Sequence, residues 1–241
     1  MTIAKILRRK MVQYFGLPRA ERRSLRAVIG HLEAKLPETV IFGGMLREFA
    51  LGKVRHFVSD IDLVCDATSD QIANALAGYP VTRNRFGGFR FIVDRRRFDI
   101  WALPDTWAFR EGHVALPATF DALLDTSFFN LDAAYFHLGT RQVVTHPQYD
   151  SWMNCRLLEV NLERNPHPEQ MVRRTLDLVL RHQLAVGPKL LNFVGRFGLP
   201  EGVSWEQTAI YENMVAFAST HQDETFNFSP QVELLPGSPS M

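Results

Sequence analysis

The sequence has few cysteines, no long apolar run and, after Arg196, no lysine or arginine. Its two cysteines, Cys65 and Cys155, predict no disulfide framework, and no Cys/His cluster has the spacing of a zinc site. No stretch approaches the ~18 consecutive apolar residues of a membrane-spanning helix, and the first residues lack the apolar core of a signal peptide. We therefore expect a cytoplasmic protein that meets a reducing environment and has no membrane partner.

Charge is unevenly distributed, although the net charge is only +1. Residues 1–30 hold eight lysines and arginines against one acid, Glu21, whereas six acids and no base follow Arg196. Such asymmetry is typical of a basic nucleic-acid-binding face with a separate acidic end. A solvated basic helix explains the same pattern, and the sequence leaves both interpretations open.

The 241 residues suit one large domain, or one domain with a small extension. Short apolar runs bounded by turn residues predict strands at 38–42, 59–66, 89–94 and 96–103 and a strand pair within 131–145. Helical patterns lie between these runs and take over from Pro168 onward. The prediction is an α/β (α+β) fold, a mixed sheet with flanking helices over residues 1–150. A helical extension over 151–221 and a flexible acidic tail over 222–241 are expected to follow.

Asp60 and Asp62 lie on the predicted strand at 59–66, where alternate side chains project to the same face. Two like charges so close disfavour each other's ionisation unless a cation lies between them, and carboxylate oxygens are the ligands that Mg²⁺ prefers. The pair therefore indicates a metal site. Two solvated carboxylates at a strand end are the alternative.

Asp99 lies in a second apolar strand, where a carboxylate needs a partner. If this strand lies beside the strand at 59–66, Asp99 completes a cluster of three carboxylates. Two metal ions ~4 Å apart in such a cluster can hold a triphosphate and activate a hydroxyl for in-line attack. The alternative is an ion pair of Asp99 with Arg90, Arg96 or Arg97.

Gly43 and Gly44 separate a predicted strand from a short helix, a place where the backbone can approach phosphates closely. The block VIFGGMLREFALGKVRHFVSDIDLV, with the later hairpin RFGGFRFIVDRRRFDIWAL, resembles the head domain of class II CCA-adding enzymes and bacterial poly(A) polymerases of the DNA polymerase beta superfamily. The likeness covers residues 38–145 and extends weakly to EQMVRRTLDLVLRHQLAVG, which resembles the family's neck helix.

The resemblance implies a nucleotidyltransferase that moves a nucleoside monophosphate from an NTP, or a dNTP, to a hydroxyl at a nucleic-acid 3′ end. Asp60, Asp62 and Asp99 are then both catalytic and metal ligands for two Mg²⁺ ions, with Mn²⁺ as a substitute. Gly43, Gly44, Arg47, Arg85 and Arg173 are then the nucleotide-binding residues.

Three features depart from the family. Arg47-Glu48 stands where the family has Arg-Asp, residues 125–133 replace its nucleotide motif, and its base-selecting neck motif has no clean counterpart. Synthesis of oligonucleotides or DNA without a template, or nucleotidylation of a protein, in a bacterial defence or toxin system is therefore the alternative function. The sequence leaves the acceptor, the base and any protein partner open.

Overall fold

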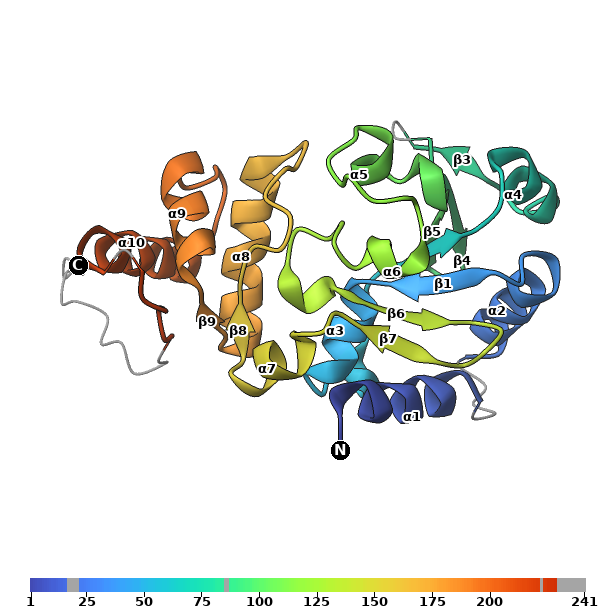
Figure 1. The fold of residues 1–241 in the computed structure, drawn as a ribbon, viewed down its shortest axis with the longest axis horizontal. Coiled ribbons are helices and arrows are strands. Elements are labelled where there is room, and N and C mark those ends of the chain that lie inside the picture. The colour runs from blue at the N-terminus through green and yellow to red at the C-terminus, as the bar shows by residue number, and fades with distance from the viewer. Residues whose placement is uncertain (17–21, 85–86, 222, 229–241) are drawn as a thin grey trace, which may run out of the picture. The chain divides into compact units, whose positions relative to one another are not determined.

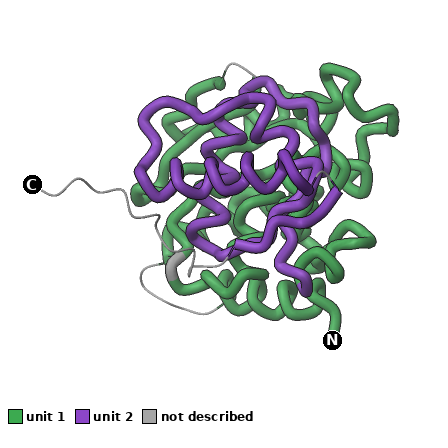
Figure 2. The backbone as a smooth tube through the Cα atoms, turned by 90° about the vertical axis from the view of Figure 1, so that its left-hand side faces the viewer, with its two compact units in different colours: residues 1–153 green, residues 154–241 purple. Residues whose placement is uncertain are grey.

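The computed structural model describes residues 1–16, 22–84, 87–221 and 223–228. The chain forms two compact units, residues 1–153 and 154–241, which Figure 2 shows in green and purple. Among the described residues, no helix is long and apolar enough to cross a bilayer.

Unit 1 is built on a seven-stranded mixed sheet with the order β3-β4-β5-β2-β1-β6-β7 (Figure 1). Its central strands β2 and β5 run parallel, and the other neighbouring pairs are antiparallel. This confirms the predicted mixed sheet. The strands are β1 (Thr39–Phe42), β2 (Ile61–Cys65), β3 (Thr82–Arg83), β4 (Phe89–Val93), β5 (Arg96–Ala102), β6 (Ala134–His137) and β7 (Val143–Thr145).

One face of the sheet is covered by helices from the first part of the chain. The helices of this part are α1 (Ile3–Gly16), α2 (Arg23–Lys35), α3 (Gly44–Ala50) and α4 (Ser69–Ala75). Phe15 of α1 stacks on Phe136 of β6, and Tyr79, which follows α4, packs between His31 of α2 and Phe91 of β4. Buried aromatic contacts of this kind fix the helices to the sheet.

The opposite face is covered in part by the segment that holds α5 (Trp107–Arg110) and α6 (Phe120–Leu123). Leu123 and Leu124 pack there with Val40, Val64 and Tyr135 of the sheet in one buried hydrophobic cluster. Sequence patterns did not predict these two helices, because each has only four residues and no full amphipathic period.

The hairpin of β4 and β5 fixes the alignment of the two strands. Asp94 and Arg95 form its two-residue turn, both with positive φ (47° and 63°), and Val93 pairs with Arg96. Positive φ at both turn residues is the conformation that matches the twist of the flanking strands. The predicted hairpin around Arg95 is therefore confirmed.

Unit 2 is mainly helical, with α8 (Pro168–His182), α9 (Pro188–Phe197) and α10 (Trp205–Thr220), while α7 (Tyr149–Asn154) crosses the unit boundary. A two-stranded parallel sheet of β8 (Leu157–Leu158) and β9 (Ala185–Val186) joins it. In the predicted tail, Phe226 exchanges both backbone hydrogen bonds with Val186. Residues 222 and 229–241 of that tail lie outside the described residues.

Candidate active site

The three predicted carboxylates lie on one face of the central parallel strands. Asp62 on β2 pairs with Asp99 on β5, which in turn pairs with Arg90 on β4. Because paired residues in neighbouring strands point to the same side, these three side chains form a row across the sheet. Asp60 lies two residues before Asp62 and shares its face. The expectation that the strand of Asp99 lies beside the strand of Asp62 is therefore confirmed.

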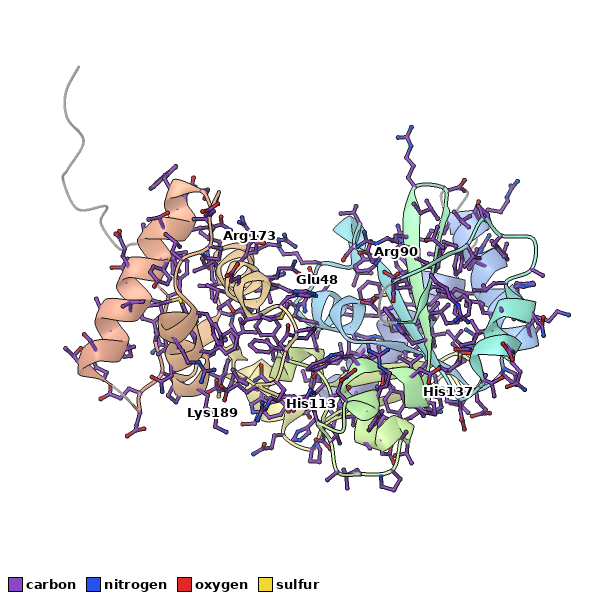
Figure 3. All side chains as sticks on the ribbon, turned by 90° about the horizontal axis from the view of Figure 1, so that it is seen from above. Glu48, Arg90, His113, His137, Arg173 and Lys189 are labelled. Carbon is purple, nitrogen blue, oxygen red and sulfur yellow. The ribbon has the colours of Figure 1, made fainter. Side chains whose placement is uncertain are left out.

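Two arginines contact these carboxylates. Arg90, labelled in Figure 3, donates from Nε to Asp99 Oδ1 at 2.7 Å and from Nη2 to Oδ2 at 3.1 Å. Arg97 donates from Nη2 to Asp60 Oδ2, and its Nε lies 3.6 Å from Asp99 Oδ2. The hydrogen bond to Asp99 raises the pKa of the Arg90 guanidinium and outweighs desolvation, which lowers it. The alternative interpretation of Asp99, an ion pair with a neighbouring arginine, thus describes this structure.

A packed tryptophan, Trp101, lies on the same face of the sheet as the carboxylates. Trp101, two residues beyond Asp99 on β5, shares its side of the sheet and lies against Gly88. A Cβ atom added to Gly88 would lie 2.1 Å from Trp101 Nε1, so only glycine fits under the indole ring. The side chain of Asp99 is 4% exposed, whereas that of Arg90 is 40% exposed. The row of charges therefore runs from the buried centre of the sheet out to solvent.

The turn after β1 lies at the same edge of the sheet as Asp60. The register of β1 and β2 pairs Ile41 with Leu63, so its continuation brings Gly43 opposite Ile61. Gly43 has φ 76° and ψ −124°, a conformation that residues with a Cβ rarely adopt. Its carbonyl accepts from the N–H of Leu46 at 2.9 Å and so begins α3. The Gly-Gly pair is thus placed next to the carboxylates by the pairing of β1 with β2.

Arg47 is buried, with only 5% of its surface exposed. Its guanidinium forms ion pairs with Asp132 and with Glu48, which Figure 3 labels on α3. Burial opposes the charge of Arg47, but Asp132 and Glu48 outweigh that effect and raise the pKa of the guanidinium. The structure therefore places Arg47 between α3 and the segment after α6, and not on the surface.

The other two predicted nucleotide-binding arginines are Arg85 and Arg173. Arg85 lies outside the described residues. Arg173, on α8 and labelled in Figure 3, donates from Nη1 to the carbonyl of Gly202 at 3.2 Å and from Nη2 to the carbonyl of Glu201. In this structure Arg173 therefore links α8 to the turn before α10, within unit 2.

Among the described residues, no three Asp, Glu, His or Cys side chains are grouped so that they would hold a metal ion. At the predicted site, guanidinium groups contact the oxygens of Asp60 and Asp99. The chemistry of the donors still fits a hard divalent cation, because Asp62 and Asp99 are paired on two adjacent strands and Asp60 lies just before the first of them. Carboxylate oxygens are the ligands that such a cation prefers, so the residue types present fit the ion.

Sequence reasoning gave too little weight to Arg90 and Arg97, which it considered only as partners of Asp99. The signal was present, because Arg97 and Asp99 are two residues apart on one strand and must share a face. Asp132, the partner of Arg47, was not predicted as part of any site. It lies 85 residues from Arg47 in the chain, and no local pattern links the two.

Comparisons with known proteins bear on the fold. A CCA-adding enzyme in complex with CTP has a TM-score of 0.58 at 12% identity, with 90% of this chain and 56% of that chain covered. The apo form I of a CCA-adding enzyme has a TM-score of 0.57 at 13% identity, covering 95% and 57%. The Thermotoga maritima CCA-adding enzyme complexed with tRNA gives 0.56 at 14% identity, covering 90% and 55%.

This chain spans about half the length of those proteins. No protein-family model matches the sequence, and no curated protein matches it. A match over at least 90% of the chain extends beyond residues 1–153 into unit 2. The chain therefore has the nucleotidyltransferase-like fold of the CCA-adding enzymes, which confirms the resemblance drawn from its Gly-Gly and Asp-x-Asp motifs.

Proposed function

We propose that this protein is a metal-dependent nucleotidyltransferase that moves a nucleoside monophosphate from an NTP to the 3′ hydroxyl of a nucleic acid. One observation carries the proposal. Asp62 and Asp99 are paired on two adjacent parallel strands, and Asp60 and the turn at Gly43 lie at the end of the first of them, in a chain with the fold of nucleotidyltransferases.

The carboxylates would hold two divalent cations, Mg²⁺ or Mn²⁺. Bound there, such cations neutralise triphosphate charge and lower the pKa of an attacking hydroxyl. The pairing of β2 with β5 fixes the spacing of Asp62 and Asp99 in the backbone.

In the proposed reaction, the oxygen of the acceptor hydroxyl attacks the α-phosphorus of the nucleotide. The bond from the α-phosphorus to the oxygen that bridges to the β-phosphate breaks, and pyrophosphate leaves with that electron pair. Asp99 accepts the hydroxyl proton. Two hydrogen bonds from Arg90 hold the Asp99 carboxylate in a fixed orientation.

Gly43 and Gly44 would cradle the triphosphate with backbone N–H groups. The conformation of Gly43 supports this assignment, because its positive φ turns the chain sharply between β1 and α3. We assign Arg47 an indirect role, since its ion pair with Asp132 is buried beneath that turn and stabilises it. Arg85 and Arg173 remain candidates for contact with the nucleotide.

The candidate nucleic-acid surface is the basic first part of unit 1, on helices that cover the sheet face opposite the carboxylates. The exposed basic residues include Lys5, Arg8 and Arg9 of α1 and Arg23 of α2. Lys10 Nζ instead donates a hydrogen bond to the carbonyl of Phe49 at 2.7 Å. Exposed lysines and arginines in one region attract the phosphates of a nucleic acid.

The direct test supplies each labelled NTP and dNTP with Mg²⁺ to the purified protein. The acceptors are an RNA that ends in a free 3′ hydroxyl and the same RNA blocked by a 3′ phosphate. The proposal expects label on the free RNA alone, and none after EDTA. Label on the blocked RNA, or on the protein itself, would contradict a 3′ hydroxyl acceptor and favour a protein hydroxyl instead.

A further inference from the structure

Arg97 lies between two of the carboxylates assigned to the metals. Its Nη2 donates to Asp60 Oδ2, and its Nε is 3.6 Å from Asp99 Oδ2. One guanidinium thus faces two of the carboxylates that would hold the cation. Arg97 is one residue before Phe98, the partner of Ile61, so the register of β5 and β2 itself brings Arg97 beside Asp60.

Arg90 and Arg97 hold their carboxylates with different strength. Arg90 binds Asp99 through two hydrogen bonds, and the Asp99 side chain is only 4% exposed. Such a bidentate pair with a buried partner is costly to break. Arg97 contacts Asp60 at a site where the two side chains are 43% and 33% exposed. Ion pairs exposed to this degree contribute little to stability, so Arg97 can leave at a small cost.

We infer that Arg97 is a displaceable counter-ion of the catalytic centre. It neutralises Asp60 and Asp99 in the metal-free protein, gives way to the divalent cation, and then binds the triphosphate of the incoming nucleotide. This inference rests on the proposed function. Without the arginine, carboxylates packed this closely would repel one another in the metal-free state.

The released guanidinium has a suitable target. Arg97 is on the same face and the same strand as Asp99, so its side chain remains next to the position where the reacting phosphates would bind. A guanidinium carries a planar fork of N–H donors that matches phosphate oxygens in pairs. The cation and the nucleotide therefore bind together more favourably than the cation alone.

The test is Arg97→Gln, measured in two titrations. Without nucleotide, Mn²⁺ is titrated by calorimetry, and removal of the competing charge is expected to tighten binding on the order of tenfold. With saturating Mg²⁺, a non-hydrolysable NTP analogue is titrated, and loss of the phosphate contact is expected to weaken binding by roughly tenfold or more. A residue that only supported the fold would not move the two affinities in opposite directions.

Arg141→Gln is the matched control. Arg141 forms an ion pair of 2.6 Å with Glu33, and these side chains are 37% and 31% exposed, close to the values for Arg97 and Asp60. The control is expected to change neither affinity. Arg97→Lys, which keeps a positive charge without the planar fork, is expected to bind Mn²⁺ like the wild type and the NTP analogue more weakly.

Asp62→Asn separates the two ways to fail. If the wild type binds no Mn²⁺, or binds it as tightly as Asp62→Asn does, the proposed function itself is wrong. If Mn²⁺ binding depends on Asp62 but Arg97→Gln leaves it unchanged or weaker, the metal site stands and the counter-ion role of Arg97 is overturned.

Discussion

Replacement of glycine by alanine is expected to destabilise the protein at Gly88 and to stabilise it at Gly30. Gly88 sits under the indole ring of Trp101, and an added Cβ would lie 2.1, 2.4 and 2.6 Å from three ring atoms. Gly30 is an exposed position within α2 with no atom within 4 Å of an added Cβ. Alanine is therefore too large at position 88 and a better helix former at position 30.

The cost at Gly88 cannot be relieved by a small shift of the backbone. Its N–H donates to Asn84 Oδ1 at 3.0 Å, and its carbonyl accepts from the Asn84 N–H at 2.8 Å. Trp101 is held on β5, whose neighbour at this point is the buried Val64. Overpacking of a rigid site costs about 1–3 kcal/mol. In contrast, Gly30→Ala should stabilise α2 by about 0.5–1 kcal/mol.

The assay is urea unfolding followed by fluorescence and circular dichroism. We expect Gly88→Ala to lower, and Gly30→Ala to raise, the midpoint with an unchanged slope. A Gly88→Ala, Trp101→Leu double variant should recover part of the loss, because the two side chains are in contact. A neutral Gly88→Ala, or a loss that persists in full without the indole ring, would refute the packing argument.

Two further predictions concern groups away from the carboxylates. Glu159 accepts hydrogen bonds from the N–H groups of Lys189 (3.2 Å) and Leu190 (2.7 Å) at the start of α9. Glu159→Ala should therefore lower the free energy of unfolding by about 1–3 kcal/mol, and a change within 0.3 kcal/mol, on the order of ordinary surface scatter, would argue against the cap. Burial raises the pKa of the Cys65 thiol to about 12, whereas Cys155 is exposed. Because the thiolate is the reactive form, iodoacetamide at pH 8 should label Cys155 and leave Cys65 intact in the native protein, as mass spectrometry of peptides would show. Equal labelling of both cysteines would contradict the buried placement of Cys65.

Elements with a clear period or a strong boundary signal could be predicted from the sequence. Thr68 and Gln71 have the spacing of a capping box, and the Thr68 side chain accepts from the N–H of Gln71 at the start of α4. The predicted strand at 59–66 is observed as β2, which contains Asp62 and begins one residue after Asp60. Such local signals predict the observed elements because the tertiary contacts favour the same local structure.

Features set by contacts between distant residues could not be predicted. The pair of Arg47 and Asp132 joins residues 85 positions apart, and the two helices over the sheet are too short to show a period. The choice of Arg90 as a partner of Asp99 depends on the register of the hairpin. That register is set by the turn at Asp94 and Arg95, where aspartate is a common first residue but arginine stands where glycine is usual.

The central claim is that the carboxylate row on β2 and β5 is the catalytic centre. The most direct measurement compares the rate of nucleotide transfer in Asp62→Asn with that in Asp66→Asn, an exposed carboxylate at the other end of β2. Each 1.4 kcal/mol of lost transition-state stabilisation is about a tenfold loss of rate, and a lost metal ligand should cost several such factors. We expect Asp62→Asn to lose roughly a thousandfold in rate while Asp66→Asn keeps the wild-type rate. Near-normal transfer by a correctly folded Asp62→Asn would contradict the account.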